Sequence, residues 1–279
     1  MPVRIVTDST CDLPAEVIAR YGICVLPLYI HVGKQSFLDG VDMTRDEFYN
    51  RLPTFSAHPT TAVPSPQKFR LVYETLAKEG ASDVLSIHVS AGLSGVVAVA
   101  QAAARETAST RVTVFDSRQL SLGTGFLVET AAKLAAAGHS VGEITAVLSA
   151  QIPCTHVFAV LDTMEFLRRS GRVNQLMASL GTLLQIKPIM SVYDGQVSAE
   201  RVRTHERALT RLVEMLHGVG PFERVALVHA AAPKRVAELR AKAAALLPVD
   251  NLLVADVTPV IGVHTGPGAA GFVVVAARA

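Results

Sequence analysis

This sequence lacks the features of a secreted or membrane-spanning chain. Its three cysteines, Cys11, Cys24 and Cys154, are isolated from one another and are expected to be small, mostly buried residues. No apolar run reaches the roughly 18 residues that a bilayer-spanning helix needs. The first nine residues have a strand pattern in place of a basic leader and an apolar stretch. We therefore expect a cytoplasmic protein in a reducing compartment.

The sequence also lacks the signals of nucleic-acid, nucleotide and metal binding. The formal charge is +2 and no basic block occurs, so nucleic acid is not an expected partner. Neither Asp8-Ser9-Thr10 nor Asp116-Ser117, each at the end of a predicted strand, is followed by a glycine-rich phosphate-binding motif. The nine histidines show no i, i+4 pairing. We expect no zinc site and no cofactor.

What the chain does contain is a large apolar fraction in an alternating strand and helix pattern. Half of its 279 residues are hydrophobic and 18% are charged, which is enough to build one large core or two smaller ones. Strands are predicted at residues 4–7, 23–32, 83–89, 111–115, 156–161, 186–192, 197–201, 224–228, 252–257 and 271–276. The main helices are predicted at residues 13–21, 66–79, 96–106, 121–137, 141–150, 205–216 and 233–246, and a short helix is predicted to begin after Thr44.

This alternation predicts an α/β fold with parallel or mixed sheets. A modest break at Pro153 to Thr155 is the candidate boundary between two α/β domains, residues 1–154 and 155–279. Asp194-Gly195 between two strand patterns predicts a β-hairpin. Asp12 and Ser65 are expected to cap the helices that follow them, and Thr44 and Ser140 to open capping boxes.

The most informative segment is the Ser/Gly turn at residues 90–95. It follows an apolar strand and opens an alanine-rich helix, an order that gathers free backbone N–H groups at a helix N-terminus and favours an anion. Ser90 and Ser94 add two hydroxyls, and the turn has no Lys or Arg. These features suit one carboxylate better than a polyphosphate. Simple capping of the helix is the competing interpretation.

Two further loops and one arginine cluster contain candidate ligand contacts. Thr61 lies in a hydroxyl- and proline-rich loop and is not needed for capping. His264 opens the glycine-rich loop 264–269, where it could bond a carboxylate or only the backbone. Arg168, Arg169 and Arg172 crowd a polar stretch, either as a solvated helix end or as a docking surface for an anionic partner.

Together these stretches resemble the DegV family, the fatty-acid-binding proteins that serve bacterial fatty acid kinase. The matching pieces are residues 5–14, 61–65, 90–95, 116–118, 161–173, 187–189 and 264–269, in the order of the family. The resemblance implies two α/β domains with one long-chain fatty acid, such as hexadecanoate, buried between them. It implies that the carboxylate is held by Thr61 and Ser94 with His264 nearby. Ser90 is added as a further candidate from its place on the turn.

The resemblance also implies a carrier that performs no catalysis. Such a carrier presents the bound carboxylate to a separate ATP-dependent kinase subunit, which forms an acyl phosphate for phospholipid synthesis. Arg168, Arg169 and Arg172 would then meet the kinase or, transiently, the membrane surface. Departures from the family pattern at Ala62, Val63, Ala91 and Val96 affect the finer hydrogen bonding around the head group.

Two alternatives remain open from the residues alone. One is a serine-dependent acyl hydrolase that uses Ser94 and His264, although the turn does not match the G-x-S-x-G spacing of a nucleophile elbow. The other is a binding protein for a small anion. The sequence does not fix the acyl chain length, its unsaturation, the oligomeric state or the identity of the kinase.

Overall fold

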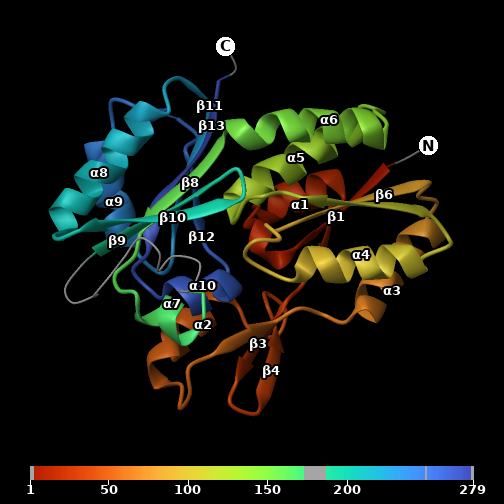
Figure 1. Ribbon diagram of the computed structural model, residues 1–279, viewed down its shortest axis with the longest axis horizontal. Coiled ribbons are helices and arrows are strands. Elements are labelled where there is room, and N and C mark those ends of the chain that lie inside the picture. The colour runs from red at the N-terminus through yellow and green to blue at the C-terminus, as the bar shows by residue number, and fades with distance from the viewer. Residues whose placement is uncertain (1–2, 173–186, 249, 278–279) are drawn as a thin grey trace.

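The computed structural model describes residues 3–172, 187–248 and 250–277, arranged as two α/β halves side by side (Figure 1). The first half is built on a parallel sheet in the order β2-β1-β6-β7. These strands are β1 (Val3–Asp8), β2 (Cys24–Leu26), β6 (Asp83–His88) and β7 (Arg111–Asp116). The wholly parallel pairing requires crossover helices, which cover both faces.

The helices of the first half divide between the two faces of that sheet. One face is covered by α3 (Pro66–Lys78) and α4 (Val96–Glu106), which pack on each other. The other is covered by α1 (Ala15–Tyr21), α5 (Leu122–Ala136) and α6 (Val141–Gln151). Helix α5 is buried along most of its length because it also packs against strands of the second half.

The second half is built on a mixed sheet in the order β10-β9-β8-β13-β11-β12. Its strands are β8 (Thr155–Val160), β9 (Lys187–Tyr193), β10 (Gln196–Val202), β11 (Phe222–His229), β12 (Leu253–Asp256) and β13 (Ala270–Ala276). Only β11 and β12 pair in parallel. The helices α8 (His205–Gly218) and α9 (Pro233–Lys242) cover one face.

The central strand β13 shows why the two halves form one continuous interior. Phe272 and Val274 face α8 and α9, whereas Val273 and Val275 join the apolar cluster that includes Phe126 of α5. Successive side chains of a strand point to opposite faces, so a strand that is apolar at every position is buried on both. The N-terminal half therefore covers the face of this sheet that α8 and α9 leave open.

A third, small antiparallel sheet lies beside the junction of the halves, in the order β4-β3-β5. It contains β3 (Tyr29–Val32), β4 (Gln35–Leu38) and β5 (Thr60–Ala62). Three helices lie near it: α2 (Arg45–Arg51), α7 (Glu165–Arg169) and α10 (Pro259–Thr265). Helix α10 contacts α2, α7, β3 and β5. No helix of the described residues is both long and apolar enough to cross a bilayer.

The fold class predicted from the sequence is confirmed, and so are the hairpin at Asp194-Gly195 and the capping boxes of Thr44 and Ser140. The single strand predicted over residues 23–32 is wrong. Pro27 interrupts it, since proline has no N–H for a sheet ladder, and the two parts join different sheets as β2 and β3. Helix α10 was not predicted.

Two predicted helix caps are also wrong. Ser65 occupies the N-cap position of α3 with Pro66 following it, but its side chain makes no capping hydrogen bond. Pro14, not Asp12, precedes the first turn of α1. Asp12 is instead fully buried between the two halves, where it accepts hydrogen bonds from Thr258 N at 2.8 Å and Ser121 Oγ at 2.6 Å.

Burial gives Asp12 an unusual pKa. Desolvation raises the pKa of its carboxyl to about 7, against the opposing effect of Arg45, whose Nη2 lies 3.2 Å from Oδ1. The folded protein therefore holds a proton on Asp12 in a pH range where the unfolded chain has lost it. The contribution of this group to stability is present at low pH and is lost as the pH rises from about 4 to about 7.

We predict that Asp12→Asn removes this pH dependence. Between pH 4 and pH 7, Asp12 makes the free energy of unfolding of the wild type fall by as much as ~1.4 kcal/mol per pH unit, and the variant loses that part of the slope. Urea denaturation at pH 5, 6, 7 and 8 measures it. Asp250→Asn, at an exposed carboxyl, is the control and keeps the wild-type slope. Equal slopes in Asp12→Asn and wild type would contradict the assignment.

Candidate functional site

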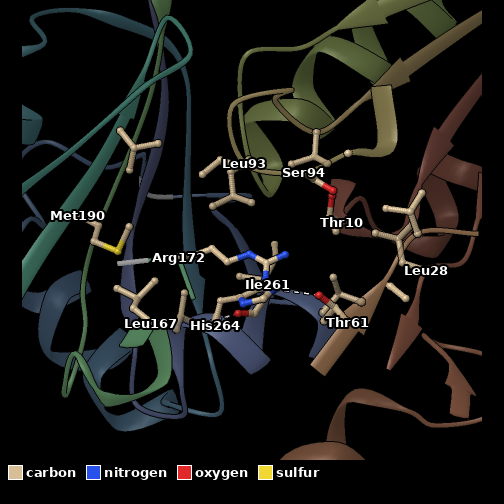
Figure 2. Close-up of a pocket in the computed structure, with 18 residues that line it drawn as sticks. Thr10, Leu28, Thr61, Leu93, Ser94, Leu167, Arg172, Met190, Ile261 and His264 are labelled. Carbon is tan, nitrogen blue, oxygen red and sulfur yellow. Dashed lines mark hydrogen bonds between the residues drawn. The ribbon is translucent and has the colours of Figure 1, made fainter. Parts of the chain in front are cut away.

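A pocket opens at the junction of the two halves (Figure 2). It contains about 870 Å³ of space free of protein atoms, including its opening to solvent. Most of the 18 lining residues are apolar. The polar ones are Thr10, Thr61, Ser94, Arg172, His264 and Thr265. An apolar pocket with a few polar groups is typical of a site for a small molecule with one polar end.

A hydrogen bond between distant segments joins two of the predicted site residues. Thr61 lies in β5 and His264 in the last turn of α10, and Thr61 Oγ1 lies 3.1 Å from His264 Nε2. Thr61 was expected in a loop, and His264 was expected to open one. Both instead belong to regular elements, which hold them more firmly than a loop would.

The position of α10 depends on contacts at both its N-terminus and its middle. At the N-terminus Thr258 N donates to Asp12, and the hydroxyl of Tyr49 donates to Val257 O at 3.1 Å. In the middle Gly262 packs directly on Tyr49, where a Cβ would lie 2.5 Å from the phenolic oxygen. The absent side chain lets α10 approach α2 closely enough to bring His264 to Thr61.

The electrostatics of the pocket favour a single anion. Burial, with Arg172 and His58 nearby, lowers the pKa of His264 to about 3, so its imidazole is neutral at pH 7. Its Nδ1 is buried and has no hydrogen-bond partner among the described residues. Arg172, whose Nη1 donates to Ser170 O at 2.7 Å, is the charged residue among the described lining. One guanidinium with neutral donors suits one carboxylate.

The Ser/Gly turn has the predicted order of strand, turn and helix, with β6 before it and α4 after it. Ser94 and Gly95 line the pocket, and no side chain caps α4. Ser90 does not line it. Ser90 is buried and stabilises the turn, since its carbonyl accepts from Leu93 N and Ser94 N and its N–H donates to Gln119 O.

The three arginines of the predicted cluster have different surroundings. Arg168 and Arg169 lie outside the pocket lining, are exposed, and both pair with Glu165. Arg172 lines the pocket on the same side as Leu167 and His264. The sequence grouped the three by proximity along the chain, but α7 ends at Arg169 and the chain turns inward after it.

A buried chain of hydrogen bonds behind the pocket was not predicted. Asp8 accepts from His88 Nδ1 at 2.9 Å, from Val89 N at 3.2 Å, and from both the N–H and the hydroxyl of Thr10. Burial acts to raise the pKa of Asp8, but the bonds from His88 and Thr10 hold it below its ordinary value. Because Thr10 and Val89 line the pocket, Asp8 holds this part of its wall in place. The signal in the sequence was the Asp8-Ser9-Thr10 strand end.

The hydrolase arrangement, which the sequence left open, and a metal site, which it did not favour, can both be compared with this geometry. The Nε2 of His264 bonds Thr61, and in the part of the chain that the structure describes Ser94 has no hydrogen bond to His264. No three His, Cys, Asp or Glu side chains gather as metal ligands within the described ranges.

Fold and pocket together define an α/β protein with a largely apolar site enclosed between two halves. Comparison with known sequences identifies the family. The family model described as an uncharacterised protein of the DegV family matches residues 2–277, and the chain belongs to this family. The resemblance seen in the sequence is thereby confirmed.

The similar proteins cover nearly the whole chain. A DegV domain-containing protein of Streptomyces coelicolor is 36% identical over 278 residues, 98% of each chain. A Thermus thermophilus structure described as fatty acid binding of a DegV family protein has a TM-score of 0.89 at 36% identity and covers 99% of this chain and 100% of its own. The structure of DegV from Bacillus subtilis, described as a fatty acid binding protein, has a TM-score of 0.90 at 29% identity and 98% coverage of both. None of these three descriptions names a catalytic activity.

We predict that Gly262→Ala destabilises the protein by about 1–3 kcal/mol, because the new methyl group meets the Tyr49 ring. Thermal unfolding measures the effect. Gly142→Ala is the matched control, since Gly142 lies within helix α6 with open space around its Cα, and it is expected to be neutral or slightly stabilising. If both variants unfold at the wild-type temperature, the close packing of α10 on α2 does not contribute to the stability of the protein.

Proposed function

We propose that this protein binds one long-chain fatty acid in the pocket between its halves. The observation that carries the proposal is the pairing of a largely apolar pocket with Thr61, Ser94, His264 and Arg172 among its polar groups. Burial of about 14 methylene groups contributes on the order of 11 kcal/mol before the costs of association are subtracted. The donors then stabilise the carboxylate, which would be costly to bury unpaired.

In the proposed complex the carboxylate takes hydrogen bonds from the hydroxyls of Thr61 and Ser94. His264, neutral at pH 7, donates its Nε2–H to the oxygen of Thr61 in this complex, which leaves the hydroxyl hydrogen of Thr61 for the carboxylate. Arg172 supplies the positive charge. We therefore assign Arg172 to the head-group site, apart from Arg168 and Arg169. Ser90 acts indirectly, through the turn that presents Ser94.

We further propose that the protein is a carrier. It presents the carboxylate to a separate ATP-dependent kinase in the cytoplasm, with transient contact to the membrane surface, and the acyl phosphate enters phospholipid synthesis. The relatives from Thermus thermophilus and Bacillus subtilis, described as fatty-acid binding, support the binding step. The absence of a nucleotide motif from the sequence supports a partner for phosphorylation. Exposed Arg168 and Arg169 suit contact with that partner or with anionic lipid.

We predict that Thr61→Val and Ser94→Ala each weaken fatty-acid binding by about 10- to 100-fold, because each loses one donor to a buried carboxylate, worth roughly 1–3 kcal/mol. Displacement of a fluorescent fatty acid measures the affinity, and native mass spectrometry of the gently purified protein tests for a bound acid. Thr60→Val, at the exposed neighbouring position of β5, is the control and keeps wild-type affinity. Unchanged affinity in both site variants would overturn the head-group assignment. Wild type that binds small carboxylates but no fatty acid would favour the small-anion alternative.

A second prediction separates docking from binding. The double variant Arg168→Ala with Arg169→Ala retains its bound fatty acid, but a cognate kinase phosphorylates that acid more slowly, most clearly at low ionic strength, because exposed charges are screened by salt. Arg172→Gln instead purifies with less bound lipid. The measurements are the lipid-to-protein ratio and the kinase rate per loaded molecule. If the double variant loses its lipid, Arg168 and Arg169 contribute to fatty-acid binding and the docking role is wrong.

A further inference from the structure

The hairpin formed by β9 and β10 contributes a wholly apolar wall to the pocket. Its two-residue turn has Asp194 and Gly195 with φ of 46° and 78°, as a type I′ turn requires. Met190 and Val197 line the pocket. They lie on the same face of the hairpin, since Met190 pairs with Ala199 and Val197 with Val192 across the two strands. No described polar side chain of the hairpin reaches the pocket lining.

The tip of this hairpin is fastened to the other half of the molecule. Arg118 Nη1 lies 3.0 Å from Asp194 Oδ1, and Gly195 N donates to Arg118 O at 2.9 Å. Gly195 has a φ of 78°, which favours glycine, and a Cβ there would lie 3.0 Å from Arg118 Nε. We call the contacts of Arg118 with Asp194 and Gly195 the clasp.

The clasp is joined to the loops that form the opposite wall. Asp116 Oδ1 accepts from Arg118 N at 2.8 Å and from Ala91 N at 3.1 Å, so one carboxylate holds both the loop after β7 and the Ser/Gly turn. These loops contribute Leu120 and Leu93 to the pocket. The clasp therefore sets the distance between the hairpin wall and the wall that carries Ser94.

The hairpin wall is remote from the proposed head-group site. In Figure 2 Met190 lies on the opposite side of Arg172 from Thr61 and Thr10. Points that are well separated in a projection are separated in space. A fatty acid whose carboxylate is held near Thr61 and whose chain crosses the pocket then brings its far methylene groups to Met190 and Val197.

Resting on the proposed function, we propose that the clasped hairpin determines which acyl chain lengths the pocket accepts. Met190 and Val197 are the specificity-determining contacts for the far end of the chain, and Arg118 is a positioning residue that holds them there. Each methylene that becomes buried strengthens binding by about fourfold. The gain continues until the chain end packs against Met190 and Val197, so loss of these contacts weakens the binding of long chains and a bulkier side chain there excludes them.

The test is a series of saturated fatty acids with 10, 12, 14, 16 and 18 carbons, with affinity measured for each by displacement of a fluorescent fatty acid. In Met190→Ala combined with Val197→Ala, the 16- and 18-carbon acids bind at least fivefold more weakly and the 10-carbon acid changes by less than twofold. Val197→Phe moves the preferred length to shorter chains by at least two carbons. Arg118→Gln shows the same selective loss for long chains, to a smaller extent.

Two controls make the outcome decisive. Arg111→Gln removes an exposed ion pair with Asp83 at the other end of β7 and leaves the whole series unchanged. Leu28→Ala alters the pocket on the side away from Met190. Selective loss of long chains in Leu28→Ala but not in the hairpin variants would overturn the proposal, because the chain would then run the other way.

The remaining outcomes separate this inference from the function on which it rests. If the wild type binds no acid of the series, the proposed function fails and the inference with it. If the wild type binds the series and the folded hairpin variants, checked by thermal unfolding, change all lengths by the same factor, the inference alone fails. Selective loss at long lengths in both Arg118→Gln and the double alanine variant supports it.

Discussion

The buried carboxylate of Asp12 is the interaction on which the rest of the site depends. It lies between the halves and joins three separate elements, through Thr258 at the start of α10, Ser121 at the start of α5, and Arg45 of α2. A carboxyl group removed from water is stable only where such donors surround it. The halves must therefore meet in one relative orientation, and that orientation brings α10 to β5. The pocket is a product of this junction and of neither half alone.

The sequence predicted most of what local pattern determines. Residues within a few positions of one another determine strands β1, β6 and β7, the hairpin at Asp194-Gly195, and the capping boxes, and all are present. Helix α10 could not be predicted in this way. It has seven residues, including a proline and a glycine, and it is stable because Tyr49 and Asp12 hold it from outside.

The site residues also divide into those that local pattern predicts and those that depend on tertiary contacts. Thr61, Ser94 and His264 came from loops and strand ends in the sequence, and the structure brings all three to one pocket. The sequence could not show that Arg172 lines the pocket while Arg168 is exposed, because the direction of the chain after α7 depends on tertiary packing. It also missed that β3, β4 and β5 form a sheet, since Gln35–Leu38 and Thr60–Ala62 are too short to show periodicity before they pair.

The hydrogen-bonded chain that supports Thr10 continues on the far side of Asp8. His88 Nε2 lies 2.7 Å from Ser86 Oγ, which in turn lies 2.9 Å from the hydroxyl of Tyr73. Serine, histidine and aspartate thus stand in the order and at the spacings of a hydrolase triad. Yet Ser86, His88 and Asp8 are all 0% exposed, and a phenol occupies the place where an ester would have to enter. The distances alone do not make Ser86 a nucleophile. Because the three groups are closed off from solvent, their hydrogen bonds serve to hold the pocket wall at Thr10 in place.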